Sequence, residues 1–150
     1  MIAVVQRVLE ANVTVDGDVV GRIARGLVVL VAVHATDTVG DVAWTAAKLA
    51  GLRVFPAGDK HYDLDVTAAG GTVLLVSNFT VAAETRQGRR PSLDAAAKPD
   101  AAKPLFEALA QALRELGVAV ETGRYQAAMR VGLVNDGPCT FLVDSRGSRA

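Results

Sequence analysis

Two hydroxyl side chains stand at the end of an otherwise apolar segment. Ser77 and Thr80 belong to "SNFTV", which follows the run "GTVLLV". Such a hydroxyl is a weak nucleophile unless a base activates it. The sequence has neither a G-x-S-x-G motif nor a lysine three residues after Ser77, so a triad hydrolase fits poorly. The hydroxyls either bond the strand end or line a pocket.

The second unusual stretch is "NDGPCT", residues 135–140, which lies between two apolar, strand-like flanks. Asn-Asp-Gly favours the positive φ angles of a tight turn, and proline has no N–H for a sheet ladder. Taken alone, the six residues predict a turn between two strands. Cys139 has no base near it in sequence and is interpreted as a small buried hydrophobe.

Metal and thiol chemistry are disfavoured by the scarcity of ligands. His34, His61 and Cys139 are dispersed along the chain, which is unlike the clustered ligands of a zinc site. A single cysteine excludes an internal disulfide. We therefore expect no metal and no cofactor.

The elements that must position these residues are short strands and two helices. Valine-rich segments between Gly and Asp turn signals predict a β-meander over residues 3–34, with a hairpin at "TVDGDVV". Helical spacing of apolar residues predicts helices over 38–50 and 103–116, the second with Pro104 in its first turn.

The rest of the chain completes one sheet. The run "GTVLLVSNFTV" predicts a buried strand, and further strands are expected near 118–124, 128–134 and 139–144. No linker or repeat divides residues 1–150, so we expect one domain. The order predicts an α+β fold with a mixed or antiparallel sheet.

Charge and hydropathy limit which nucleic-acid and membrane contacts are expected. Sixteen basic and sixteen acidic side chains cancel, so a contact with tRNA or DNA would have to be local. Residues 84–103 carry five basic and three acidic side chains, a solvated face or a phosphate contact. No apolar run approaches the roughly 20 residues of a membrane span, and we expect a cytoplasmic protein.

With both motifs and their flanks, the chain resembles the D-aminoacyl-tRNA deacylase family, also called D-tyrosyl-tRNA deacylases. The resemblance extends through "AVVQRV", "VDGDVVGRIARGLVVLVAV", "LLVSNFTV", "GRRPS" and "MRVGLVNDGPCTFLVD", essentially the whole chain. It implies a homodimer with a barrel-like α+β fold. The implied reaction is hydrolysis of the ester of D-aminoacyl-tRNA, and of glycine mischarged on tRNA for alanine.

The resemblance also assigns roles to residues. The strand end implies catalytic residues, through backbone N–H groups that stabilise an oxyanion: Ser77, Asn78, Phe79 and Thr80. The second motif and one strand imply substrate-binding residues: Gly137, Pro138, Met129 and Asn135. In the family the Gly-Pro peptide is cis and reaches into the partner subunit's site, where it rejects L-residues. The ribose 2′-hydroxyl of the tRNA is expected to help activate water.

The sequence differs from the family pattern at some positions, and two other functions stay open. Asn78 stands where the family has Gln, and "KHYDLDV" at 60–66 differs from the family's loop. The rival readings are a related deacylase that removes L-alanine from tRNA, and a non-catalytic dimer that binds tRNA ends. Partners are expected to be tRNA and a second copy, with no DNA and no membrane.

Overall fold

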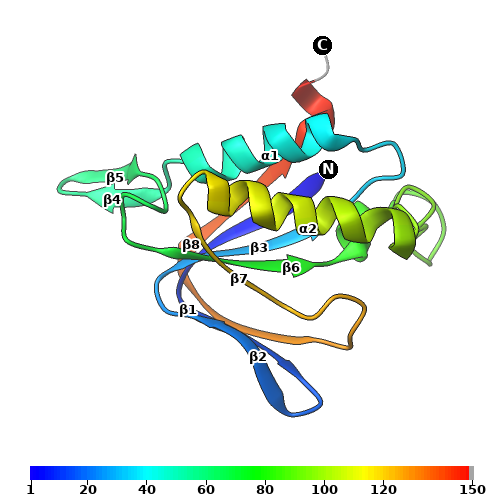
Figure 1. The fold of residues 1–150 in the computed structure, drawn as a ribbon, viewed down its shortest axis with the longest axis horizontal. Coiled ribbons are helices and arrows are strands. Elements are labelled where there is room, and N and C mark those ends of the chain that lie inside the picture. The colour runs from blue at the N-terminus through cyan, green and yellow to red at the C-terminus, as the bar shows by residue number, and fades with distance from the viewer. Residues whose placement is uncertain (149–150) are drawn as a thin grey trace.

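The computed structural model describes residues 1–148, and it is a mixed β-sheet, curled nearly into a barrel, with two helices packed on one face (Figure 1). The strands of this sheet are β1 (Ile2–Val15), β2 (Asp18–Ile23), β3 (Gly26–Ala32), β6 (Thr72–Ser77), β7 (Ala119–Thr122) and β8 (Arg130–Asp144). The other elements are α1 (Val39–Gly51), β4 (Phe55–Ala57), β5 (Lys60–Leu64), η1 (Phe79–Ala82), α2 (Pro99–Glu115) and η2 (Ser145–Ser148). The expected α+β class is confirmed.

Strand β1 organises the sheet because its two halves have different neighbours. Its first half pairs with β3, its second half pairs with β2, and β8 lies antiparallel along nearly its whole length. The β1–β2 hairpin is confirmed at Asp16 and Gly17, whose φ angles of 54° and 94° are those of a tight two-residue turn. One long strand shared in this way bends the sheet toward closure.

Three neighbouring strands of the sheet are parallel. β3, β6 and β7 run parallel, and the two helices lie in the connections between them. The β3–β6 contact begins at Gly26, where an added Cβ would lie 1.9 Å from the carbonyl oxygen of Thr72. Glycine is therefore required for this close approach.

The sheet has an apolar core on each face. The larger core packs α1 and α2 on the sheet and includes Leu49, Leu75 and Leu109, all fully buried. The smaller core lies inside the curl and includes Val13 and Leu74. Because alternate residues of a strand face opposite sides, β6 is buried on both faces and reads as a continuous apolar run.

Both predicted helices are confirmed, each with a shifted start. Helix α1 begins one residue after the predicted start, and the Thr38 backbone N–H donates to Asp41 Oδ2 at 2.9 Å across its first turn. Helix α2 begins at Pro99 rather than residue 103, since Pro99 suits the first helical position and the Lys98 carbonyl accepts from Ala101 and Ala102. Pro104 therefore lies inside the helix.

Two strand predictions were wrong and one hairpin was missed. The meander was expected to have separate strands in "AVVQRVLE" and "ANVTVDGD", but residues 2–15 form one strand, because β8 supports both halves. Residues 130–144 also form one strand: "NDGPCT" is an irregular stretch within β8 and not a turn between strands. The small β4–β5 hairpin was not predicted, since its strands of three and five residues give little periodicity.

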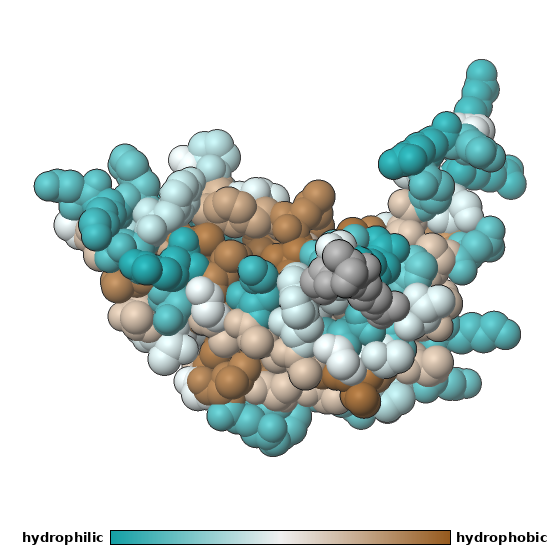
Figure 2. Space-filling view, turned by 90° about the horizontal axis from the view of Figure 1, so that it is seen from above, coloured by the Kyte–Doolittle hydropathy of each residue, from teal (hydrophilic) through white to brown (hydrophobic). Residues whose placement is uncertain are grey.

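The surface is mixed. Seen from above, apolar side chains gather in the middle of the molecule, and hydrophilic side chains project at both ends (Figure 2). The loop between η1 and α2 lies at the right-hand end in both views. None of the described helices has the length and apolar character needed to cross a membrane.

Candidate functional site

The Ser77–Thr80 segment marks the carboxyl end of β6. Ser77 pairs with Val31 of the parallel strand β3, and the Asn78 N–H donates to the Val31 carbonyl at 2.8 Å. The chain then turns into the short 3₁₀ helix η1, which starts at Phe79. The Asn78 N–H therefore makes the last hydrogen bond between β6 and β3, and the chain leaves the sheet at Phe79.

The next two N–H groups are available to a ligand. Within residues 1–148, the backbone N–H groups of Phe79 and Thr80 form no hydrogen bond, as expected at the first residues of a helix. The Thr80 hydroxyl donates to Asn78 Oδ1 at 2.5 Å. Because an amide oxygen is not a base, this contact does not activate the hydroxyl as a nucleophile.

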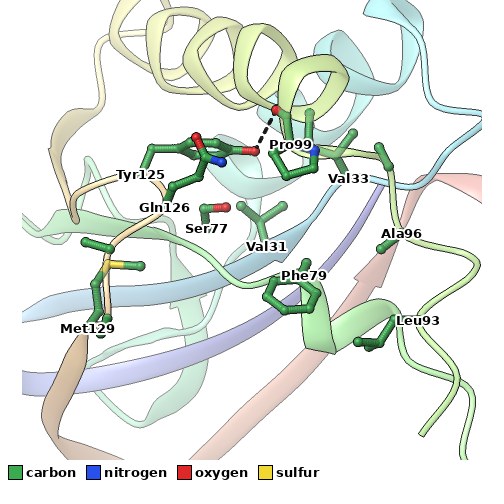
Figure 3. A pocket seen from close by; sticks show the side chains of 14 residues that line it. Val31, Val33, Ser77, Phe79, Leu93, Ala96, Pro99, Tyr125, Gln126 and Met129 are labelled. Carbon is green, nitrogen blue, oxygen red and sulfur yellow. Dashed lines mark hydrogen bonds between the residues drawn. The ribbon is translucent and has the colours of Figure 1, made fainter.

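A cavity of about 550 Å³ opens beside this segment, between the ends of β3 and β6 and the start of α2 (Figure 3). Its size is that of a small-molecule site. Its wall is mostly apolar and is formed by Val31, Val33, Ser77, Phe79, Leu93, Ala96, Ala97, Pro99, Ala102, Tyr125, Gln126, Ala127, Ala128 and Met129. The strand end is thus a pocket wall, as one of the two sequence interpretations predicts.

Tyr125 connects two parts of the wall. Its hydroxyl donates to the Pro99 carbonyl at 3.1 Å (Figure 3), and its ring packs against Phe106 of α2. Burial, together with the charges of Asp100 and Glu107, raises the pKa of the Tyr125 phenol above its ordinary value. The neutral Tyr125 side chain therefore links the β7–β8 loop to the start of α2 through its hydrogen bond to Pro99.

A second cavity of about 410 Å³ adjoins the first and shares Ser77, Phe79, Ala127 and Met129 with it. Met129 sits at this junction, where Gly123 makes room for it: a Cβ on Gly123 would lie 2.6 Å from the Met129 sulfur. Three predicted residues of the first motif, Ser77, Asn78 and Phe79, are thus brought together with Met129 around two adjoining cavities, whereas Thr80 lines neither.

Apart from the Tyr125 phenol, the described walls of the two cavities carry no titratable side chain. Among the described residues that line them, there is no Asp, Glu, His, Cys, Lys or Arg. Cys139 is 2% exposed and lies in the main core, as the packing interpretation predicts. No cluster of metal-ligating side chains occurs in residues 1–148.

The second motif lies elsewhere in the chain, within β8 opposite Arg7. The Gly137–Pro138 peptide bond is cis. Asn135 spans the two residues, because its Nδ2 donates to the Cys139 carbonyl at 3.0 Å and its Oδ1 accepts from the Cys139 N–H at 2.8 Å. This amide therefore holds the loop, while its direct contact with substrate stays a prediction.

Glycine is required at position 137. An added Cβ there would lie 2.1 Å from the Cys139 nitrogen and 2.8 Å from its Cβ, so the loop would have to shift. Arg7 supports the same loop from β1: it is 12% exposed, and its Nε lies 3.0 Å from both the Asp136 carbonyl oxygen and the carboxylate Oδ2. Its Nη1 donates to the Val54 carbonyl at 2.5 Å.

The loop lies outside both cavities of its own chain. Asp136 lies beside Arg7, whereas Ser77 is aligned with Ala3 through Val31. Gly137 and Pro138 line neither cavity, although Val131 and Leu133 of the same strand line the second. The structure therefore does not bring Gly137 and Pro138 to the cavities of their own chain.

An apolar row joins the two regions across the sheet. Leu142, Val4, Leu30 and Val76 are aligned in register on β8, β1, β3 and β6, so their side chains share one face. Leu142 is 73% exposed, and Leu30 and Val76 line the second cavity. The row thus leads from an exposed apolar side chain to the site.

Sequence reasoning missed Arg7, Tyr125 and Gln126. An arginine inside the apolar segment "AVVQRVLE" was a usable signal for Arg7, because such a charge needs a partner. Tyr125 and Gln126 lie in a loop between two strands, where no periodicity marks which side chains face a cavity. These two residues line the cavity because the start of α2 packs near them in the folded chain.

The family model and the similar curated proteins all name the same kind of deacylase. The family described as D-Tyr-tRNA(Tyr) deacylase matches residues 4–144. A D-aminoacyl-tRNA deacylase of Thermus aquaticus is 52% identical and one of Geobacter sulfurreducens is 49% identical. Each alignment covers 97% of this chain, with 95% and 96% of the respective relative.

Solved structures have the same fold. A protein described as c-Myc DNA unwinding element binding protein superposes with a TM-score of 0.90 at 31% identity, over 96% of this chain and 98% of its own. A probable eukaryotic D-amino acid tRNA deacylase superposes with a TM-score of 0.82 at 14% identity, over 95% and 97% of the two chains. The second likeness concerns the fold alone.

Proposed function

The chain belongs to the D-Tyr-tRNA(Tyr) deacylase family, and on that premise we propose that it hydrolyses the ester of D-aminoacyl-tRNA to free D-amino acid and tRNA. The observation that carries the proposal is that Ser77, Asn78 and Phe79 of the family motif "SNFT" line two adjoining cavities, with Thr80 next in the chain. We propose that the terminal adenosine occupies the larger cavity, with the scissile ester beside Phe79 and Thr80.

The free N–H groups of Phe79 and Thr80 support a role in stabilising the oxyanion. Hydrolysis of an ester passes through a tetrahedral intermediate whose oxygen gains negative charge. Two backbone donors fixed at the start of η1 need no reorganisation to bind that oxygen, and such donors are worth about 3 kcal/mol each in known sites. The Asn78 N–H is not included, because it donates to Val31.

The attacking group is proposed to be water, assisted by the vicinal 2′-hydroxyl of the substrate's own ribose. The absence of a basic side chain from the described cavity walls supports this assignment. It also argues against Thr80 as the nucleophile, since its hydroxyl donates to an amide oxygen. The protein then contributes orientation and fixed dipoles.

Selectivity for the D-configuration is assigned to Gly137 and Pro138 of a second copy of the chain. The separation of this loop from the cavities of its own chain supports an arrangement across subunits. The apolar row from Leu142 to Val76 supports the contact, because a second copy covering Leu142 would lie against the second cavity. Rigid backbone placed there would reject an L-substituent without enclosing a D-side chain, and glycine would also be accepted.

Contact with tRNA is proposed to be local, near the mouth of the larger cavity. Arg89 and Arg90 are exposed and form no ion pair within the described residues, and they lie shortly before Leu93 of the cavity wall. Phosphates attract such side chains. This arrangement reconciles a tRNA substrate with a chain of zero net charge.

Deacylation of matched D-Tyr-tRNA and L-Tyr-tRNA tests the proposal. We expect rapid release of D-tyrosine and no acceleration of L-tyrosine release above the uncatalysed rate. Preferential cleavage of L-Ala-tRNA would assign the chain to the L-alanine editing activity instead. Binding of tRNA without any cleavage would identify a non-catalytic protein.

A further inference from the structure

Gln126 has a backbone conformation that its residue type disfavours. Its φ angle is 58°, and Asp16 is the other residue besides glycine with a positive φ within residues 1–148. A side chain with a Cβ is disfavoured in this left-handed region, and glycine is the residue that adopts it without strain. A long polar side chain placed there at a cavity suggests that the side chain has a use.

Gln126 is solvent-exposed and places a polar amide at the edge of an apolar wall. It lines the larger cavity, and Figure 3 shows it beside Tyr125 and near Ser77. The Tyr125 hydroxyl donates to the Pro99 carbonyl. The Gln126 side chain, by contrast, makes no hydrogen bond within the described residues, so both its donor and its acceptor remain available to a ligand.

We propose that Gln126 determines specificity for the terminal base of the substrate by binding the N6 amine and N7 of adenine. A glutamine amide places an acceptor and a donor side by side, and adenine offers the matching donor and acceptor on that edge. Valine, alanine and phenylalanine side chains of the wall supply the apolar surface for the ring. This inference rests on the proposed function and on its placement of the adenosine.

Altered substrates combined with altered protein test the contact directly. The D-Tyr-tRNA is prepared with a terminal adenosine, a purine riboside that lacks the N6 amine, or a 7-deazaadenosine that lacks N7. For the unaltered protein we expect kcat/KM to fall about tenfold with each analogue, the scale of a bidentate contact with a base. For Gln126→Gly we expect the analogues and adenosine to react equally.

Glycine is the chosen replacement because it accepts the φ of 58° and removes only the side chain. Asp16→Gly is the matched control, since Asp16 has a φ of 54° in the β1–β2 turn and lines neither cavity. It should keep the full penalty for both analogues. Free adenosine, titrated by NMR, should bind more weakly to Gln126→Gly than to the control, which gives a readout independent of turnover.

The failures of the two proposals are distinguishable. If the unaltered protein does not cleave D-Tyr-tRNA, the proposed function is wrong and this inference is lost with it. If the protein cleaves D-Tyr-tRNA but Gln126→Gly keeps the penalty for either analogue, another group reads the base. The assignment of Gln126 would then be overturned while the deacylase activity stood.

Discussion

At the scale of single residues, the site is unusual in what its side chains do not provide. The hydroxyl of Thr80 is tied to the Asn78 amide, and the described cavity walls carry no titratable group except the Tyr125 phenol, whose raised pKa keeps it neutral. In the proposed mechanism, the groups that act on the ester are backbone N–H groups and the substrate's own hydroxyl. We therefore expect the chemistry to be insensitive to most side-chain replacements.

Thr80→Ala tests that view. If Thr80 is not the nucleophile, its removal should leave kcat on D-Tyr-tRNA within about tenfold of the unaltered value, because the N–H of residue 80 remains. A D-Tyr-tRNA ending in 2′-deoxyadenosine should be nearly inert with either protein. Single-turnover rates decide the matter: an inactive Thr80→Ala together with a reactive deoxy substrate would indicate a threonine nucleophile.

At the scale of elements, the irregular part of β8 depends on a few side-chain contacts in place of a regular ladder. Asn135 bonds both backbone groups of Cys139, while Arg7 bonds Asp136 from the neighbouring strand. Strand pairing with β1 shifts register on this stretch. The loop that we assign to selectivity is therefore held by contacts that can be removed one at a time.

Asn135→Ala should loosen the loop without unfolding the sheet. It removes two hydrogen bonds, each worth about 1 kcal/mol, and we expect a lower melting temperature and a reduced D-over-L ratio. Asn135→Asp is the graded comparison, since it keeps an acceptor for the Cys139 N–H at 2.8 Å and loses the donor to the Cys139 carbonyl. Its ratio should fall between the other two, and an unchanged ratio in Asn135→Ala would exclude the loop from chiral selection.

The elements were predictable to the extent that periodicity marked them. The two helices, the Asp16–Gly17 hairpin and the buried strand β6 followed from spacing and turn residues. The continuity of β8 through Pro138 was not predictable, because local composition favours a turn and only the pairing with β1 overrides it. Gln126 was missed for a related reason: nothing local reveals which loop side chains face a cavity.

At the scale of the whole molecule, one chain holds the two halves of the proposed site at opposite ends of its strands. The Gly137–Pro138 loop lies beside Arg7, and the cavities lie at the far end of β3 and β6. In the symmetric dimer that we propose, each loop reaches the other chain's cavities. Two kinds of variant separate these halves: Gly137→Ala, which forces the loop to shift, and Ala127→Trp, which fills both cavities.

Mixed dimers of these variants give the decisive prediction. Each variant alone should be inactive on D-Tyr-tRNA, because the tryptophan fills the cavities and the displaced loop no longer holds the substrate's Cα in position. A heterodimer of Gly137→Ala with Ala127→Trp, however, contains one unaltered cavity facing one unaltered loop. We expect it to have about half the wild-type activity, because one of the two sites of a symmetric dimer is intact. The chains are given different affinity tags and co-expressed, and the purified heterodimer is assayed on D-Tyr-tRNA.

The control places both changes in one chain and pairs it with an unaltered chain. If the loop acts across subunits, this heterodimer has one altered half in each site and should be inactive. If the loop acts within its own chain, the unaltered chain keeps a complete site, so the control should be half active and the first heterodimer inactive. The two heterodimers contain the same two substitutions, so a difference between them cannot come from the composition of the protein. It can come only from which chain supplies the loop to which cavity, and a half-active control would exclude a site shared between subunits.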